Sequence, residues 1–307
     1  MADTPRGSFS NANRHMQEEE NLQLTSVGVD IGSSTSHLVF SRLELTLEGS
    51  RYRVTKREVL NESQILLTPY VDDTRIDVEA LEAFINEQYK TAKIRREEVD
   101  TGALILTGVA VRRRNARAIG ELFAEEAGKF VAVSAGDGLE ATMAAHGSGA
   151  VAHSEKIGGV VLNIDIGGGT SKFALCNNGK VQEVSAIDIG ARLLAFDKDG
   201  AIIRIEEAGR KHAGWAGFSV DLGQKISQDN LKKMVAGMID KLFALLKPEA
   251  LSEEIKGLLR LPPLAYRGEI DCVMFSGGVS EFIYNRTKSS FGDLGPLIAE
   301  EIHRRMG

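Results

Sequence analysis

The stretch VVLNIDIGGGTSKFAL, residues Val160–Leu175, decides the fold that this sequence predicts. An apolar run ends at Asp165, a turn with three glycines follows, and a second apolar run begins, which is typical of a β-hairpin. Glycines allow positive φ angles and let a ligand approach the backbone, so the turn can offer N–H groups to a phosphate, with Asp165 beside an accompanying cation. The alternative is an ordinary glycine-rich turn. The turn residues are Gly167, Gly168, Gly169 and Thr170.

The same pattern occurs near the start of the chain, in SVGVDIGSSTSHLVF, residues Ser26–Phe40. An apolar strand reaches Asp30, a turn of small residues follows, and an apolar strand leaves, which indicates an internal duplication. If the two halves face each other, their turns would hold one polyphosphate, and Asp30 and Asp165 would share its metal ion through water molecules. The residues of this first turn are Gly32, Ser33, Ser34 and Thr35.

A third glycine-rich site lies in IDCVMFSGGVSEF, residues Ile270–Phe282. A buried-type strand ends there, and adjacent glycines turn the chain into what we expect to be a helix. Adjacent glycines let a flat ring or a ribose lie against the backbone, so we interpret this turn as the nucleoside end of the same site. The alternative is a simple strand-to-helix turn. The turn residues are Ser276, Gly277 and Gly278.

Length and composition indicate a cytoplasmic protein of two lobes. The chain has 307 residues, of which 43% are hydrophobic and 26% charged, enough for lobes of roughly 100–200 residues each. A net charge of −6 argues against a nucleic-acid or membrane-surface binder. No segment approaches the ~20 apolar residues of a membrane span, and the polar start lacks a secretory signal. Cys176 and Cys272 have no metal-ligand spacing, so we expect buried, reduced thiols.

The motifs suggest how the chain is divided. Residues 1–24 are polar and have no apolar period, so we expect a disordered leader. Residues 25–150 would form the N-terminal lobe, and residues 151–307 the C-terminal lobe. A helix rich in small residues, Ala141–Ala150, would lie where the lobes meet, because small side chains let another backbone approach closely.

Two acids stand at the start of that helix. Asp137 and Glu140 lie beside glycines and near the helix N-terminus. One of them would orient a hydrolytic water molecule. The alternative is that either one simply caps the helix.

Other local patterns predict ordinary structural elements. Asp77 is placed to cap an amphipathic helix that runs to about Ala92. The stretch Asp229–Leu246 has apolar residues at helical spacing. The residues Ile157–Ile187 predict a three-stranded meander whose second turn contains Asn178 followed by glycine, a pair that tight hairpins prefer.

The order of these motifs resembles the actin-like ATPase superfamily, which includes Hsp70, sugar kinases and actin. In this comparison Asp30 and Gly32–Thr35 match the first phosphate motif and Asp165–Thr170 the second. Gly136–Gly147 matches the connecting motif, and Ser276–Gly278 the adenosine motif. More narrowly, SVGVDIGSSTSHLVFSRLEL, TGVAVRRRNAR, VSAGDGLEATMAAHGSGA and VLNIDIGGGTSKFAL resemble the ethanolamine ammonia-lyase reactivating factor family.

The resemblance implies an α/β, actin-like (RNase H-like) two-lobe ATPase fold whose C-terminal end is truncated, so that the second lobe is incomplete. It implies ATP and Mg²⁺ as cofactors, Asp30 and Asp165 as metal contacts, and a weak ATPase activity. The partner would be ethanolamine ammonia-lyase, from which damaged cobalamin would be released. We expect no nucleic-acid or membrane partner, and a cytoplasmic location with association with a bacterial microcompartment as a variant. The sequence does not indicate an oligomeric state.

Two positions depart from the Hsp70-like pattern. Lys172 stands where those members carry an acid after the glycine turn, and Gly138 stands where they carry the acid of the connecting helix. The choice between Asp137 and Glu140 as the water-orienting residue therefore stays open. Two other functions compete with a chaperone-like ATPase: a nucleotide-binding scaffold with little hydrolysis, and a small-molecule kinase.

Overall fold

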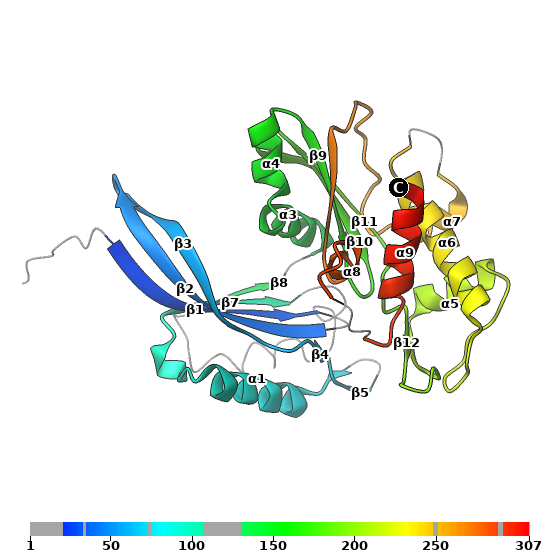
Figure 1. Ribbon diagram of the computed structural model, residues 1–307, viewed down its shortest axis with the longest axis horizontal. Coiled ribbons are helices and arrows are strands. Elements are labelled where there is room, and N and C mark those ends of the chain that lie inside the picture. Colours follow the sequence, from blue (N-terminus) through cyan, green and yellow to red (C-terminus); the bar gives the residue numbers. More distant parts are fainter. Residues whose placement is uncertain are drawn as a thin grey trace, which may run out of the picture.

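The chain folds into two lobes, each built on one β-sheet (Figure 1). The computed structural model describes residues 21–32, 35–72, 75–106, 130–134, 136–247, 251–287 and 291–306. The first sheet has the order β3-β2-β1-β7-β8, with β4 paired to β2. Its strands are β1 (Asn21–Ile31), β2 (Thr35–Glu48), β3 (Arg51–Glu62), β4 (Leu66–Leu67), β7 (Thr101–Leu106) and β8 (Phe130–Ser134).

The second sheet repeats the arrangement of the first. It has the order β11-β10-β9-β14. In the first sheet, β1 forms an antiparallel hairpin with β2 and pairs in parallel with β7 on its other edge. In the second sheet, β9 pairs in the same way with β10 and β14. This repeat confirms the expected α/β, actin-like fold. The strands are β9 (Val160–Ile166), β10 (Ser171–Asn177), β11 (Lys180–Ile187) and β14 (Cys272–Ser276).

Helix α1 (Val78–Ala92) covers one face of the first sheet (Figure 1). Its predicted cap is present, because Asp77 accepts a hydrogen bond from the N–H of Ala80. Strand β1 begins at Asn21, which corrects the expected leader at residues 21–24: these residues pair with β2. The alternate residues of β1 and β2 that face α1 form the core of this lobe with it, and they are Val27, Val29, Ile31, Leu38 and Phe40.

The second lobe has the larger core, which the amphipathic helix α6 (Gln228–Ala244) joins through its predicted apolar side. Helix α9 (Gly295–Met306) packs beside it. None of the helices in the described residues combines the length and apolar character needed to cross a bilayer. The remaining elements are β5 (Tyr70–Asp72), β6 (Arg75–Ile76), η1 (Arg96–Glu98), β12 (Leu194–Phe196), β13 (Ile202–Ile205), α5 (Glu207–Trp215), α7 (Glu253–Lys256) and α8 (Ser280–Ile283).

The expected small-residue helix is two helices. Helix α3 (Asp137–Gly147) ends before Gly149, whose φ of 85° interrupts the helix, and α4 (Ala150–Ile157) follows. Both helices pack on the second sheet, where Ala145 and Ala150 are fully buried. The packing therefore places residues 137–150, expected in the first lobe, with the second.

Candidate functional site

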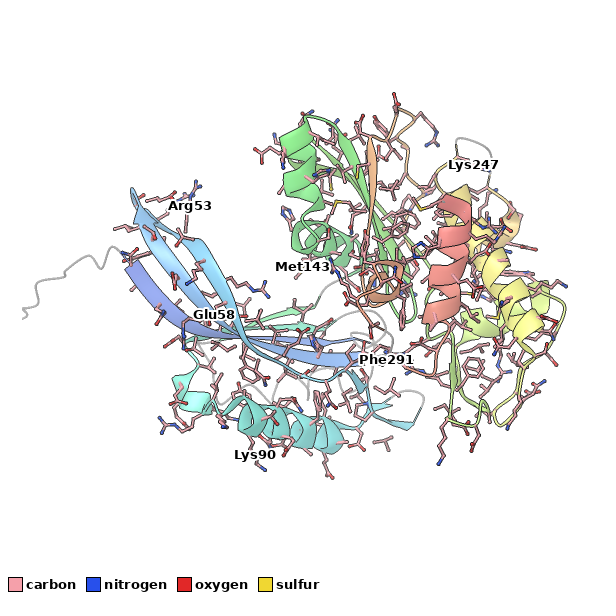
Figure 2. All side chains as sticks on the ribbon, in the orientation of Figure 1. Arg53, Glu58, Lys90, Met143, Lys247 and Phe291 are labelled. Carbon is pink, nitrogen blue, oxygen red and sulfur yellow. The ribbon has the colours of Figure 1, made fainter. Side chains whose placement is uncertain are left out.

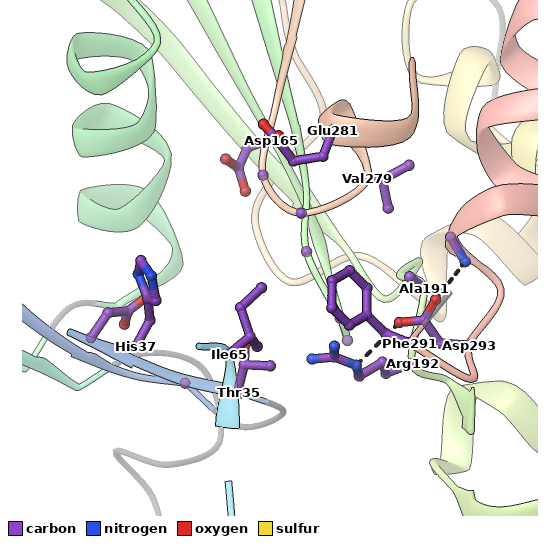
Figure 3. A pocket seen from close by; sticks show the side chains of 18 of the residues that line it. Thr35, His37, Ile65, Asp165, Ala191, Arg192, Val279, Glu281, Phe291 and Asp293 are labelled. Atoms are coloured by element: carbon purple, nitrogen blue, oxygen red, sulfur yellow. Dashed lines mark hydrogen bonds and ion pairs between the residues drawn. The ribbon is translucent and has the colours of Figure 1, made fainter. Parts of the chain in front are cut away.

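The two repeated hairpins meet at one cavity of about 810 Å³ between the lobes. Asp30 lines it from the end of β1, and Asp165 lines it from the end of β9. Figure 3 shows Thr35, His37 and Ile65 on the first-lobe side, facing Asp165 of the second lobe. The predicted juxtaposition of the two acids is therefore present in the structure.

Backbone hydrogen bonds fix the glycine turn of the second hairpin. The N–H of Gly167 donates to the carbonyl of Thr170 at 3.0 Å, while the carbonyls of Gly167 and Gly168 accept N–H groups from Ala191 and Arg192 at 3.0 and 2.6 Å. With these carbonyls fixed, the N–H groups of Gly168 and Gly169 have no partner among the described residues. Gly190, which precedes Ala191 in the chain, packs against this turn: a Cβ on Gly190 would lie 2.4 Å from the Gly168 carbonyl oxygen. The turn can thus present N–H groups to an anion.

The first turn is also held by hydrogen bonds, and one of the residues that hold it carries no sequence motif. The N–H of Gly32 donates to the carbonyl of Thr35 at 2.8 Å. The hydroxyl of Thr68 donates to the carbonyl of Gly32 at 2.8 Å and lies 3.1 Å from the hydroxyl of Ser36. Thr68 lies more than 30 residues from the turn in the chain, and no sequence motif indicated this contact. The predicted phosphate contacts Ser33 and Ser34 lie outside the described residues.

Ser276 supports Asp165 instead of lining the cavity. Its hydroxyl donates to Asp165 Oδ2 at 2.8 Å and accepts a hydrogen bond from Asn163 Nδ2 at 2.9 Å. The next two residues of the predicted nucleoside turn, Gly277 and Gly278, do line the cavity. Gly277 has a φ of 79°, and a Cβ there would lie 2.6 Å from the carbonyl oxygen of Ile166. The turn therefore presents backbone without side chains to the cavity, and position 277 requires glycine.

Glu140 and Lys172 form a buried ion pair in the wall of the cavity. Glu140 lies in the first turn of α3, and Lys172 lies opposite Asp165 in the pairing of β10 with β9. Glu140 Oε2 is buried and has no hydrogen-bond partner among the described residues. Burial raises the pKa of Glu140, although the Lys172 ammonium group acts in the other direction. One carboxylate oxygen is therefore buried beside the cavity without a hydrogen-bond partner among the described residues.

Asp137, the other candidate acid, forms an ion pair with Arg260. Its Oδ2 accepts a hydrogen bond from Arg260 Nε at 3.0 Å, and the same guanidinium donates to Asp188 Oδ1 at 3.0 Å. Asp137 is not among the residues that line the cavity. The structure therefore brings Glu140, but not Asp137, together with Asp30 and Asp165.

A second buried ion pair, Arg192 with Asp293, also lines the cavity. Arg192 Nε lies 3.1 Å from Asp293 Oδ2, and Asp293 Oδ1 also accepts the N–H of Gly295 at 2.9 Å. Burial lowers the pKa of Arg192 and raises that of Asp293. The ring of Phe291 stands beside this pair (Figure 3). Arg192 lies far from Phe291 and Asp293 in the chain, so no sequence motif pointed to the pair.

The acids of the cavity suit a magnesium ion that keeps most of its water. The described residues contain no group of three or more His, Cys, Asp or Glu side chains placed to hold a metal. Mg²⁺ needs no such cage, because it usually binds one or two carboxylates together with substrate phosphates and waters. Asp30 and Asp165 supply two carboxylates beside a turn with free N–H groups, so the residues present fit a magnesium–phosphate unit.

Comparison with known proteins identifies two curated relatives and several solved structures that are similar to this chain. The chain is 35% identical to the ethanolamine ammonia-lyase reactivases EutA of Salmonella typhimurium and Escherichia coli, over 92% of this chain. It spans 62% of the length of each. Among solved structures, a Ppx/GppA family member from Aquifex aeolicus has a TM-score of 0.48 at 17% identity, covering 88% of this chain and 72% of that one. Component A of (R)-2-hydroxyglutaryl-CoA dehydratase from Acidaminococcus fermentans has a TM-score of 0.42 at 16% identity, covering 92% and 89%.

The match to a family extends over both lobes. The model of the family described as ethanolamine utilisation protein EutA matches residues 22–306, a range that includes both hairpins, the cavity and α9. This chain belongs to the EutA family of ethanolamine utilisation proteins.

Proposed function

We propose that this chain binds Mg-ATP between its lobes, hydrolyses it slowly, and uses that cycle to reactivate ethanolamine ammonia-lyase by releasing damaged cobalamin. The observation that carries the proposal is the cavity into which the repeated hairpins bring Asp30 and Asp165. The names of the two curated relatives support the reactivase role. The expected location is the cytoplasm.

Each part of the cavity has a role in this proposal. The triphosphate would lie against the N–H groups of Gly168 and Gly169, and the nucleoside against Gly277 and Gly278. Asp30 and Asp165 would hold Mg²⁺ through its waters, and Ser276 keeps the Asp165 carboxylate in place. When bound, the ion supplies positive charge that offsets the charge of the phosphates.

Glu140 would orient the water that attacks the γ-phosphorus. It lines the cavity and has an unpaired carboxylate oxygen, whereas Asp137 is held by Arg260. In this step the water oxygen bonds to the γ-phosphorus, the bond from that phosphorus to the β–γ bridging oxygen breaks, and ADP keeps the bridging oxygen. One proton of the water stays on the phosphate product, and the other is released to solvent. Lys172 holds Glu140 in position through the buried ion pair.

Three measurements test the proposal. Calorimetry with Mg-ATP should give binding to the wild-type chain, and a phosphate-release assay should give slow turnover above the buffer blank. Asp165→Asn should lower turnover by at least about 100-fold, the order found when a key electrostatic group is removed. Inactivated ethanolamine ammonia-lyase should regain activity with the wild-type chain and Mg-ATP. Failure to bind Mg-ATP would refute the proposal.

A nucleotide-binding scaffold is the second candidate. The observation in its favour is that Glu140 is already paired with Lys172, which leaves it less free to act on water. Tight Mg-ATP binding combined with turnover equal to the buffer blank would select the scaffold over the ATPase.

A further inference from the structure

The outer part of the first sheet has one aliphatic face. In the pairing of β1 with β2, Leu24 lies opposite Leu43, and Leu22 lies opposite Leu45. In the pairing of β2 with β3, Val54 lies opposite Leu45, and Val59 lies opposite Ser41. Residues directly opposite in antiparallel strands share a face of the sheet. We call this surface the aliphatic face, and it comprises Leu22, Leu24, Leu43, Leu45, Val54 and Val59.

The reverse side of the same strands is polar and internally paired. Lys56 lies 3.1 Å from Glu44, Arg53 lies 3.1 Å from Glu48, and Arg42 lies 3.8 Å from Glu58. The hydroxyl of Thr46 donates to Asn21 Oδ1 at 2.9 Å. Polar side chains that pair with one another can face water without a protein partner. The exposed aliphatic side chains are therefore confined to the aliphatic face of these strands.

The aliphatic face is partly exposed at Leu22, Leu24, Leu43 and Leu45 and open to solvent at its two valines. None of its members belongs to a hydrophobic cluster formed by the described residues, and Val54 and Val59 are 56% and 51% exposed. The strands reach past α1 and stand clear of the second lobe (Figure 1), and Arg53 lies near their tip (Figure 2). By alternation along β1, Leu24 shares its face with Asp30, so the aliphatic face continues the sheet surface that borders the nucleotide cavity.

The charge around this face selects the kind of partner. The charges of Arg42, Arg53 and Lys56 lie on the polar side, where each is paired with a glutamate. Arg57 lies opposite Leu43, on the aliphatic side, and forms no ion pair with any described residue. A surface with carboxylates at its border would pair with Arg57.

We propose that the aliphatic face docks an apolar patch bordered by carboxylates on ethanolamine ammonia-lyase. This inference rests on the proposed function, because that function supplies the partner. Apolar contact would provide the affinity, and Arg57 would provide orientation and a dependence on salt.

The test measures binding to immobilised, cobalamin-loaded ethanolamine ammonia-lyase by surface plasmon resonance. Val54→Glu should raise the dissociation constant at least tenfold, because it places a charge within the apolar contact. The control is Thr55→Glu, since the Thr55 hydroxyl contacts Thr46 on the polar side, and it should stay within twofold of the wild type. Val59→Glu serves as a second test if Val54→Glu lowers the melting temperature.

Reversing the charge of Arg57 tests its electrostatic contribution to binding separately from the apolar contact. Arg57→Glu should weaken binding and flatten its salt dependence, whereas Arg53→Glu, on the polar side of the same strand, should do neither. Unchanged binding by Val54→Glu and Val59→Glu would overturn the inference and leave the proposed function standing. A self-association that Val54→Glu abolishes would identify a second copy as the occupant instead. If the wild-type chain does not bind the lyase at all, the proposed function and the inference fail together.

Discussion

Removal of the Lys172 side chain would leave the buried Glu140 carboxylate without its partner. Breaking a buried ion pair from one side costs roughly 3–5 kcal/mol, whereas replacing both partners is often nearly neutral. Lys172→Met should therefore destabilise the second lobe by roughly this amount in urea unfolding, and adding Glu140→Gln should recover most of the loss. Lys256→Met, which removes an exposed pair with Glu253, should cost less than about 1 kcal/mol. Equal costs for the two single substitutions would contradict the buried pairing.

The buried side chain of His212 should make the free energy of unfolding depend on pH. Burial lowers its pKa from 6.5 to about 4, and its hydrogen bond to the Asp188 carbonyl acts in the other direction. Between these values the unfolded chain binds a proton that the folded chain does not, so stability falls as the pH drops from 6.5 towards 4. The full loss is about 3 kcal/mol at 1.36 kcal/mol per pKa unit.

Urea unfolding at a series of pH values measures this loss. His212→Asn should flatten the stability curve between pH 6.5 and 4, and His303→Asn, at an exposed position of α9, should keep the wild-type slope. A wild-type slope in the His212 variant would show that other groups cause the acid sensitivity.

At the scale of elements, the turn between β14 and α8 gives a matched pair of substitutions. Gly277 has a positive φ and no room for a Cβ, whereas a Cβ on Gly278 would meet no atom within 4 Å. Gly277→Ala should lower the free energy of unfolding by about 1 kcal/mol or more because of strain, and it should weaken Mg-ATP binding. Gly278→Ala should leave unfolding unchanged in calorimetry. If the two variants unfold alike, the turn does not have the geometry described.

The elements that sequence patterns predicted well depend on neighbouring residues. Asp77 caps α1, and Asn178, with a φ of 47°, forms the tight turn of the meander, because caps and turns depend on local backbone chemistry. Partners brought from distant segments were not predictable: Thr68 under the first turn and Arg260 at Asp137 carry no motif of their own. The paired acids were found only because the hairpin is repeated.

At the scale of the whole molecule, nucleotide binding should require both lobes. A ligand at 100 times its dissociation constant stabilises the folded state by about 2.7 kcal/mol. Saturating Mg-ATP should therefore raise the melting temperature of the wild-type chain, and Asp30→Asn should reduce the increase as strongly as Asp165→Asn does. Asp199→Asn, in an exposed turn away from the cavity, should keep the full increase. Loss of the increase in Asp165→Asn alone would place the nucleotide on one lobe.

The length of the hairpin formed by β2 and β3 has a mechanical consequence. Strand β2 has 14 residues, and at about 3.4 Å per residue it extends roughly 45 Å from its cavity end. A tilt of the first lobe by about 10° around that end would displace the tip by about 8 Å on this length, while atoms near Thr35 would hardly move. If a nucleotide binds in the cavity as proposed, the hairpin would act as a lever that turns a small rearrangement at the phosphates into a displacement of several ångströms at its tip.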